Sequence, residues 1–291
     1  MNKIPNRQVI CDTLIKHGRK NKDILVITSD SRGSASMTDF ARELPEQLIE
    51  VGIAEQDLVG ISAGLAACGK KPFAASPACF LTMRSIEQIK VDVAYSNTNV
   101  KLIGISGGVS YGALGMSHHS LQDIAVMRAI PGMTIILPAD KQETKNMMEA
   151  LLRYDGPAYV RIGRNPVEDV YENTDFKYEI GKAIVLREGK DLTIIATGET
   201  VKLAVDASDA LKAEGISCRV INMHTIKPLD KDAIIEAAKE TGNIITVEEH
   251  SIFNGLGAAV AEVVVQSNPV PVRIVGIPDE PAITGTSAEI F

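Results

Sequence analysis

The sequence contains no long uninterrupted hydrophobic run, and this absence argues against membrane-spanning and exported proteins. No apolar stretch is long enough to cross a bilayer, and residues 1–19 lack the apolar core of a signal peptide. Runs of lysine and arginine are also missing, and the net charge is −7. Nucleic acid is therefore a poor candidate for the main partner. We expect a cytoplasmic protein that binds neither membranes nor nucleic acid.

Cysteines are few and far apart. Cys11, Cys68, Cys79 and Cys218 form no CxxC pair, which favours reduced and mostly buried side chains. The composition is otherwise that of an ordinary soluble globular protein, with 45% hydrophobic and 23% charged residues. A chain of 291 residues is long enough for two domains.

The glycine-rich segment 106–117 lacks two common phosphate-binding motifs. Its four glycines permit unusual backbone angles and close approach of a ligand. No Gly-Lys-Ser/Thr follows, so it is not a P-loop, and it does not match the dinucleotide fingerprint. His118 and His119 end the segment, where imidazoles could move protons or bind oxygens. Nothing at ligand spacing supports a metal pair, and one of the two could simply cap the next helix.

Short apolar strands alternate with helices along the first part of the chain. This alternation predicts a mainly parallel sheet that helices cover on both faces. We expect strands at 24–30, 48–52, 73–76, 100–105, 134–137 and 158–162, and helices at 5–17, from 57, at 83–96, from about 121, and at 140–154.

A second α/β unit follows a polar segment that carries Pro166. We expect strands at 192–196, 218–222, 243–247 and 272–275, and helices at 198–214, 230–241 and 256–265. The fold class is therefore α/β with two doubly wound domains. We place the first domain at 1–165, a linker at 166–178 and the second domain at 179–291.

Glu55 stands where the expected strand 48–52 leads into a helix. Ligands of α/β folds bind at such strand ends. A partly buried carboxylate must be paired or hydrogen-bonded, and a ring nitrogen of a cofactor would be one useful partner. The alternative is a surface glutamate that opens a helix, where the helix dipole favours it.

Several arginines fall near expected element ends, where guanidinium groups suit phosphate, sulfonate or carboxylate. Each of them alone is more often a solvated surface residue. They are Arg7, Arg32, Arg84, Arg161 and Arg164. The segment 248–251 is either part of a site or a tight junction between a strand and a helix, and we favour the junction.

Five short segments, taken in order, resemble the C-terminal section of a transketolase, as found in split, two-subunit transketolases. They are residues 51–56, 117–119, 137–140, 162–165 and 247–251. The resemblance covers nearly the whole chain and implies a pyrimidine-binding domain followed by a transketolase C-terminal domain.

In this family the half that binds the diphosphate and the metal normally precedes these two domains. No Gly-Asp-Gly with a downstream asparagine ligand occurs here. The resemblance therefore implies a partner, the transketolase N-terminal-section subunit, in an α2β2 heterotetramer. That partner would hold most of the Mg²⁺ (or Ca²⁺) and diphosphate contacts, and this chain itself would ligate no metal.

The resemblance also assigns roles near the cofactor, thiamine diphosphate. Glu55 would share a proton with the aminopyrimidine ring and so promote deprotonation of the thiazolium carbon, which attacks the ketose carbonyl. His118 would be catalytic and would contact the oxygens at the cleaved bond. Phe80 matches an aromatic residue of the pyrimidine pocket, and Met83 replaces the aromatic residue that stacks on the pyrimidine. Arg7, Ser34 and Arg164 match the positions that hold the terminal phosphate of the sugar.

Two positions depart from the family pattern. Ser106 stands where many members place a phosphate-binding histidine, and Leu114 where they place an aspartate that reads a substrate hydroxyl. These changes put the usual pentose phosphate in doubt. Arg32 or Arg84 could supply a different anion clamp, which would suit a sulfosugar or another non-standard ketose.

The resemblance implies a thiamine-diphosphate-dependent transketolase subunit that moves a two-carbon ketol unit from an anionic ketose to an aldose. Three alternatives remain: the β subunit of a 2-oxo acid dehydrogenase, a deoxyxylulose-phosphate synthase-like enzyme, and a non-catalytic regulatory subunit. Release of CO₂ from a 2-oxo acid would favour the first alternative. The presence of both Glu55 and His118 argues against the last.

Overall fold

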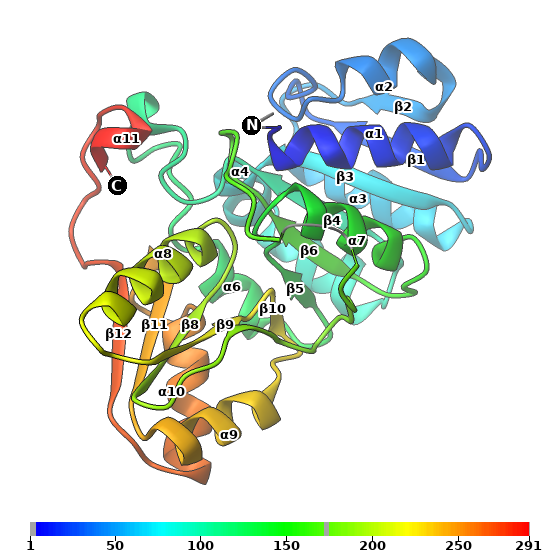
Figure 1. Cartoon of the computed structure of the whole chain (residues 1–291). Coiled ribbons are helices and arrows are strands. Elements are labelled where there is room, and N and C mark those ends of the chain that lie inside the picture. Colours follow the sequence, from blue (N-terminus) through cyan, green and yellow to red (C-terminus); the bar gives the residue numbers. More distant parts are fainter. Residues whose placement is uncertain (1–3, 172–174, 291) are drawn as a thin grey trace.

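Two mainly parallel sheets form the frame of the computed structural model, which describes residues 4–171 and 175–290 (Figure 1). The first sheet has seven strands in the order β10-β5-β6-β4-β3-β1-β2, and the second has five in the order β12-β11-β8-β9-β7. All pairs are parallel except β10 with β5 and β7 with β9. The expected α/β class and mainly parallel sheets are confirmed.

The first unit contains six strands of the first sheet and most of the helices. Its strands are β1 (Ile24–Thr28), β2 (Leu48–Glu50), β3 (Lys71–Pro77), β4 (Lys101–Ile105), β5 (Thr134–Ile136) and β6 (Ala158–Arg161). Its helices are α1 (Asn6–Gly18), α2 (Thr38–Glu43), η1 (Pro45–Gln47), α3 (Glu55–Ala67), α4 (Ala78–Arg84), α5 (Ile86–Gln88), η2 (Ile89–Tyr95), η3 (Gly112–Leu114), α6 (Asp123–Ala129) and α7 (Lys141–Leu151).

The second unit supplies the five-stranded sheet and one strand of the first sheet. Its elements are β7 (Ile184–Arg187), β8 (Leu192–Ala196), α8 (Thr200–Ala213), β9 (Cys218–Asn222), β10 (Thr225–Lys227), α9 (Lys231–Thr241), β11 (Ile244–Ser251), α10 (Leu256–Ser267), β12 (Val272–Ile277) and α11 (Ser287–Ile290).

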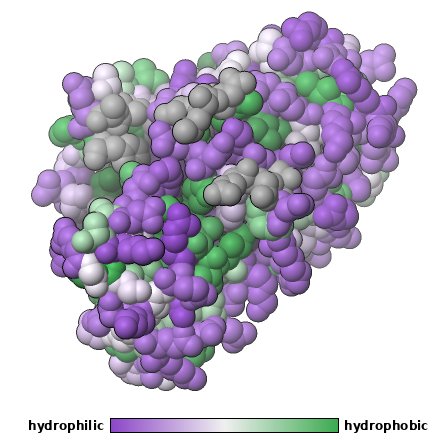
Figure 2. Space-filling model, viewed as in Figure 1, coloured by the Kyte–Doolittle hydropathy of each residue, from purple (hydrophilic) through white to green (hydrophobic). Residues whose placement is uncertain are grey.

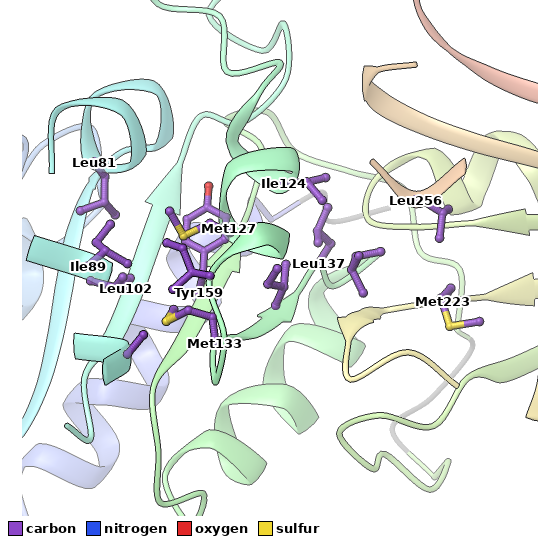
Figure 3. Close-up of a cluster of buried hydrophobic side chains, with 14 of the residues drawn as sticks. Leu81, Ile89, Leu102, Ile124, Met127, Met133, Leu137, Tyr159, Met223 and Leu256 are labelled. Carbon is purple, nitrogen blue, oxygen red and sulfur yellow. The ribbon is translucent and has the colours of Figure 1, made fainter. Parts of the chain in front are cut away.

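Helices cover both faces of the first sheet, as the alternation predicts. On one face α1 and α7 pack through Leu14 and Met148, and on the other α3 and α6 pack through Leu58 and Met127. The cluster of buried side chains that contains Leu58 and Met127 extends beyond the first unit. It runs from Leu81 and Ile89 through Leu137 to Met223 and Leu256 (Figure 3). One apolar core therefore joins the two units.

Several boundaries differ from the sequence expectations. The helix expected at 83–96 begins earlier, as α4, and is broken at Ser85, whose side chain is buried and whose backbone leaves the helical region. The chain then continues through α5 into the π-helical turn η2. Helix α3 starts at Glu55 rather than Asp57, and β11 extends four residues beyond Val247. The sequence does not predict three further elements, α2, β7 and β10, because they have too few residues to show a clear periodicity.

The segment 166–178 has no helix or strand in its described part, 166–171 and 175–178. It lies against the first unit. Pro166 forms an isolated bridge with Pro5, and the amides of Val170 and Tyr171 donate to Asp140 Oδ2 at 2.7 and 2.9 Å. The exact domain limits stay a prediction.

One face of the molecule is mainly polar (Figure 2), and the cysteines are mostly buried, as the sequence predicts for them. Most of the face in Figure 2 is hydrophilic, with smaller hydrophobic areas toward the middle of the molecule. Within residues 4–171 and 175–290, no helix is long and apolar enough to cross a membrane. All four cysteines are free, and three of them are buried.

Candidate active site

The candidate site residues follow the carboxyl ends of parallel strands of the first sheet. Ser34 comes after β1, Glu55 after β2, Phe80 after β3, His118 after β4 and Arg164 after β6. Strands that run in parallel end at one edge of the sheet, and ligands of such folds bind there. The topology therefore brings five segments, far apart in the sequence, to one edge.

Glu55 is the first residue of α3 and is buried, with 5% of its surface exposed. Arg84 Nη1 donates to both carboxylate oxygens, at 3.1 and 3.0 Å. Gln56 Nε2 donates to the carbonyl oxygen of Arg84 at 3.1 Å, which ties α3 to the end of α4. Glu55 does open a helix, but it is not the surface residue of the alternative interpretation.

The aromatic ring of Phe80 lies beside this ion pair. The guanidinium carbon of Arg84 is 4.0 Å from the ring centroid, a cation–π contact. Met83, from the same helix, is exposed on 54% of its surface. A shallow hollow of about 410 Å³ adjoins the pair of Glu55 and Arg84, and it is lined by Ile53, Ala54, Glu55, Gln56, Asp57 and Arg84.

His118 lies between two aromatic rings. Its ring centroid is 5.1 Å from that of Phe80 and 5.4 Å from that of Tyr111, edge to face in both cases. Its Nδ1 is 3.0 Å from Ser117 Oγ, so Nε2 is left for other contacts. His119 is buried, with Nε2 3.3 Å from the carbonyl oxygen of Gly112. Neither histidine caps α6, which has no side-chain cap.

Two arginines, Arg7 and Arg164, lie at the end of the candidate site that is opposite Glu55. The guanidinium carbon of Arg164 is 5.0 Å from the ring centroid of Tyr111. Arg7 Nη1 donates to the carbonyl oxygen of Ser34 at 2.6 Å, so it is the backbone of Ser34 that it contacts. Burial, and then the positive charge of Arg164, lower the pKa of Arg7. The two cations are close enough to repel each other, and an anion between them would relieve that repulsion.

The contacts join into one continuous row of side chains. The row runs through Glu55, Arg84, Phe80, His118, Tyr111 and Arg164. Sequence reasoning missed Tyr111, although an aromatic residue inside a glycine-rich segment was the available signal.

The remaining candidates lie around this row. Ser106 is fully buried with a φ of 57°, and its Oγ has no hydrogen-bond partner within the described residues. Leu114 is half exposed and lines a shallow hollow together with Tyr111 and Arg164. Arg32 is exposed.

Arg161 is not a surface residue, and the expectation of a solvated side chain is wrong for it. Its Nε lies 3.1 Å from Asp123 Oδ2, and its Nη2 donates to the carbonyl oxygen of Glu249 at 2.6 Å. Burial opposes the charge, but the acidic groups around it, Asp123 first and then Glu249, together outweigh burial and raise the pKa of Arg161. The side chain thus joins the two units and is not free to bind substrate.

The junction interpretation of segment 248–251 holds for Glu248. Its carboxylate accepts from the amides of Leu256 and Gly257 at 2.6 and 2.8 Å, at the start of α10. Glu249 and His250 instead contact the first unit: Glu249 Oε1 accepts from the amide of Val109 at 2.6 Å, and His250 Nε2 lies 3.4 Å from the amide of Ala125. Across the described ranges, no group of three or more His, Cys, Asp and Glu is placed to hold a metal ion.

Two family models match the chain in succession. Residues 2–168 match the transketolase pyrimidine binding domain, and residues 181–290 match the transketolase C-terminal domain. A solved structure described as a split gene transketolase, an inactive beta4 tetramer, is 39% identical, with a TM-score of 0.88 over 95% of this chain and 89% of that one. A transketolase of Campylobacter jejuni, 20% identical with a TM-score of 0.81 over 100% of this chain and 44% of that one, shares the fold.

Curated relatives show the same family. An apulose-4-phosphate transketolase subunit of Phocaeicola vulgatus is 58% identical over 100% of this chain and 93% of the relative. A 6-deoxy-6-sulfo-D-fructose transketolase subunit of a Clostridium species is 38% identical, over 94% and 84%. A 1-deoxy-D-xylulose-5-phosphate synthase of Heliobacterium modesticaldum is 40% identical over 94% of this chain but only 42% of its own length. The chain therefore belongs to the transketolase family and carries its pyrimidine-binding and C-terminal domains, in that order.

Proposed function

We propose that this chain is one subunit of a two-subunit, thiamine-diphosphate-dependent transketolase that transfers a two-carbon ketol unit from an anionic ketose to an aldose. One observation carries the proposal. A buried acid, Glu55, and a pair of cations, Arg7 and Arg164, lie at opposite ends of one row of side chains, with His118 between them. A cofactor ring at one end and an anionic sugar at the other would meet near His118.

The residues around Glu55 fit the aminopyrimidine end of thiamine diphosphate. Glu55 is a buried carboxylate whose hydrogen-bond partner in the described structure, Arg84, is a half-exposed side chain that can move away. Phe80 offers a ring face, and Met83, three residues further along α4, offers an exposed apolar side chain. When bound, the cofactor supplies the carbon nucleophile and accepts the electron pair of the broken carbon–carbon bond. Glu55 would hold the proton at the pyrimidine nitrogen.

The substrate end is defined by charge. His118 would donate to or accept from the oxygens next to the cleaved bond, since its Nδ1 is occupied by Ser117 and Nε2 is left available. Arg164 and Arg7 would bind the anionic group of the sugar. Leu114 brings an apolar side chain to this end of the row. That suits a ketose whose hydroxyl pattern differs from that of the usual pentose phosphate.

The substrate we propose is a non-standard anionic ketose, with apulose 4-phosphate as the first to test. The support is the similarity to relatives named for apulose 4-phosphate and for 6-deoxy-6-sulfofructose. A second candidate function, half of a deoxyxylulose-phosphate synthase, is favoured by the 40% identity to such a synthase. Condensation of pyruvate with release of CO₂ would distinguish it from ketol transfer.

We propose that a partner of the N-terminal-section type holds the diphosphate and Mg²⁺, in an α2β2 assembly. The chain lacks the Gly-Asp-Gly motif expected for that task, and Mg²⁺ commonly binds together with the phosphates of its ligand. Calorimetric titration of thiamine diphosphate with Mg²⁺ tests this division. We expect tight binding to the assembled complex and weak binding to this chain alone. Tight, Mg²⁺-dependent binding to the isolated chain would refute it.

A further inference from the structure

We propose that two buried carboxylates of the second unit, Glu199 and Glu249, position the two substrate-facing segments of the first unit. They are positioning residues, because each accepts a hydrogen bond from a backbone amide in a segment that carries a substrate-facing residue. The inference rests on the proposed function, since it assigns a task to the second unit in the same reaction.

Glu249 holds the glycine-rich segment. Its Oε1 accepts from the amide of Val109 at 2.6 Å, two residues before Tyr111, in the segment that ends at His118. Glu249 is itself fixed, because Arg161 Nη2 donates to its carbonyl oxygen at 2.6 Å. The position of the histidine segment is thus tied to strand β11 of the second sheet.

Glu199 holds the arginine segment. Its Oε1 accepts from the amide of Gly163 at 3.0 Å, and the next residue is Arg164. Glu199 lies at the start of α8, at the carboxyl end of β8. The second unit therefore contacts both the segment with His118 and the segment with Arg164.

Both contacts require glycine in the first unit. A Cβ on Gly108 would lie 2.0 Å from Glu249 Oε1, and a Cβ on Gly163 would lie 2.2 Å from Glu199 Oε2. Any side chain at either position would displace the carboxylate. Each glycine therefore fits the close approach of one carboxylate from the other unit.

Stability alone does not account for these two groups. Burial raises the pKa of Glu199 to about 8 and that of Glu249 to about 7, and the negative charge of Glu249 adds to the shift at Glu199. Apolar residues of similar volume are often as good or better for stability than buried ionisable groups. The carboxylates do, however, satisfy buried amides at defined places, which an apolar side chain cannot do.

Glu248 provides a matched control. It is the neighbour of Glu249 on β11 and is equally buried, and burial raises its pKa to about 7 as well. Its carboxylate accepts from amides at the start of α10, inside the second unit. Replacing it should affect stability without moving either substrate-facing segment.

The test compares Glu199→Met, Glu249→Met and Glu248→Met in the assembled complex, with an anionic ketose and with neutral erythrulose. Methionine keeps the volume but removes the acceptor. We expect Glu199→Met to raise KM for the anionic ketose about three- to tenfold, from the loss of one hydrogen bond, and to leave KM for erythrulose unchanged. Glu249→Met should lower kcat about tenfold for both sugars, because it releases the segment of His118. Glu199→Gln and Glu249→Gln keep an acceptor and should restore most of the loss.

Amide hydrogen exchange on the isolated chain gives a second readout that needs no activity. Glu249→Met should speed exchange at Val109, Glu199→Met at Gly163, and Glu248→Met at neither. The inference is overturned if both substitutions leave exchange and the kinetic ratios unchanged, or if Glu248→Met has the same effects. Absence of ketol transfer in the wild-type complex would instead refute the proposed function, while the exchange result would still decide the positioning.

Discussion

Arg84 contacts both Glu55 and Phe80, the two side chains that the pyrimidine ring of the proposed cofactor would need. Its Nη1 lies 3.1 and 3.0 Å from the two oxygens of Glu55, and its guanidinium carbon lies 4.0 Å from the centroid of Phe80. The carboxylate and the ring are therefore covered by one half-exposed side chain. Arg84 must leave before a pyrimidine ring can take its place.

Replacing Arg84 should strengthen cofactor binding. Arg84→Ala removes a competitor whose ion pair with Glu55, half-exposed on the arginine side, contributes about 1 kcal/mol, so the Kd of the complex for thiamine diphosphate should fall about fivefold. Calorimetric titration measures this change. Arg153→Ala, which removes an exposed arginine elsewhere on the first unit, is the control and should leave Kd unchanged. Weaker binding by Arg84→Ala would show that Arg84 contacts the cofactor instead of competing with it.

Glu55→Gln should abolish most of the turnover while the fold survives. The amide has nearly the same shape but cannot exchange a proton with the pyrimidine nitrogen, so kcat should fall about a hundredfold or more. Asp232→Asn, an exposed substitution in the first turn of α9, is the control. Steady-state kinetics of the reconstituted complex, with circular dichroism of each variant, provide the comparison. A Glu55→Gln complex within a few-fold of wild type would remove this residue from its role.

Arg164→Ala should distinguish charged from neutral sugars. If the guanidinium binds the anionic group away from water, its loss costs about 2–5 kcal/mol in kcat/KM for an anionic ketose and little for erythrulose. Kinetics with apulose 4-phosphate, 6-deoxy-6-sulfofructose, xylulose 5-phosphate and erythrulose measure the difference. Equal losses on charged and neutral sugars would dismiss the clamp. A larger loss from Arg32→Ala would assign the clamp to Arg32, and a strong preference for xylulose 5-phosphate would refute the altered pocket.

Stability should fall as the pH rises toward 8, in part because of Glu199. Burial raises the pKa of this carboxyl to about 8, above an unfolded value of about 4.3. Between about pH 4 and about pH 8, the folded chain therefore holds a proton that the unfolded chain has released. The contribution to stability is complete below about pH 4 and is lost as the pH rises through about 8.

Urea unfolding of the isolated chain at several pH values tests this effect. Glu199→Gln cannot titrate, so its stability should decline less than that of the wild type between about pH 5 and about pH 8. Glu179 is the control, because its hydrogen bond and ion pair with Lys177 lower its pKa. Glu179→Gln should leave the slope in that range unchanged. Parallel curves for Glu199→Gln and wild type would contradict the shift.

Much of the frame follows from local sequence patterns. The apolar runs at Ile24, Leu102 and Ile194 mark strands of both sheets, because a strand covered on both faces must be apolar throughout. Glu55 can be predicted as a candidate site residue from the sequence, because it follows such a strand, where ligands of α/β folds bind. The interaction of Glu55 with Arg84 cannot be predicted in this way, since the two residues are 29 positions apart.

What the sequence did not predict depends on contacts between the two units. Arg161 resembles an ordinary strand-end arginine, and only the folded chain shows that Asp123 and Glu249 enclose it. Glu199 and Glu249 likewise bond to amides 36 and 140 positions away. Strand β10 is three residues long, and it forms because Thr225 pairs with Ile136 of the first unit. The residue pattern within a single segment cannot predict these contacts, because each one joins segments that are far apart in the sequence.

The most direct test of the whole account is ketol transfer from an anionic ketose by this chain alone, by an N-terminal-section partner alone, and by their equimolar mixture. Each sample contains thiamine diphosphate and Mg²⁺. We expect turnover in the mixture and none above background in either chain by itself, because the partner would hold the diphosphate and this chain would supply the row from Glu55 to Arg164. Turnover by this chain alone equal to that of the mixture would contradict the account.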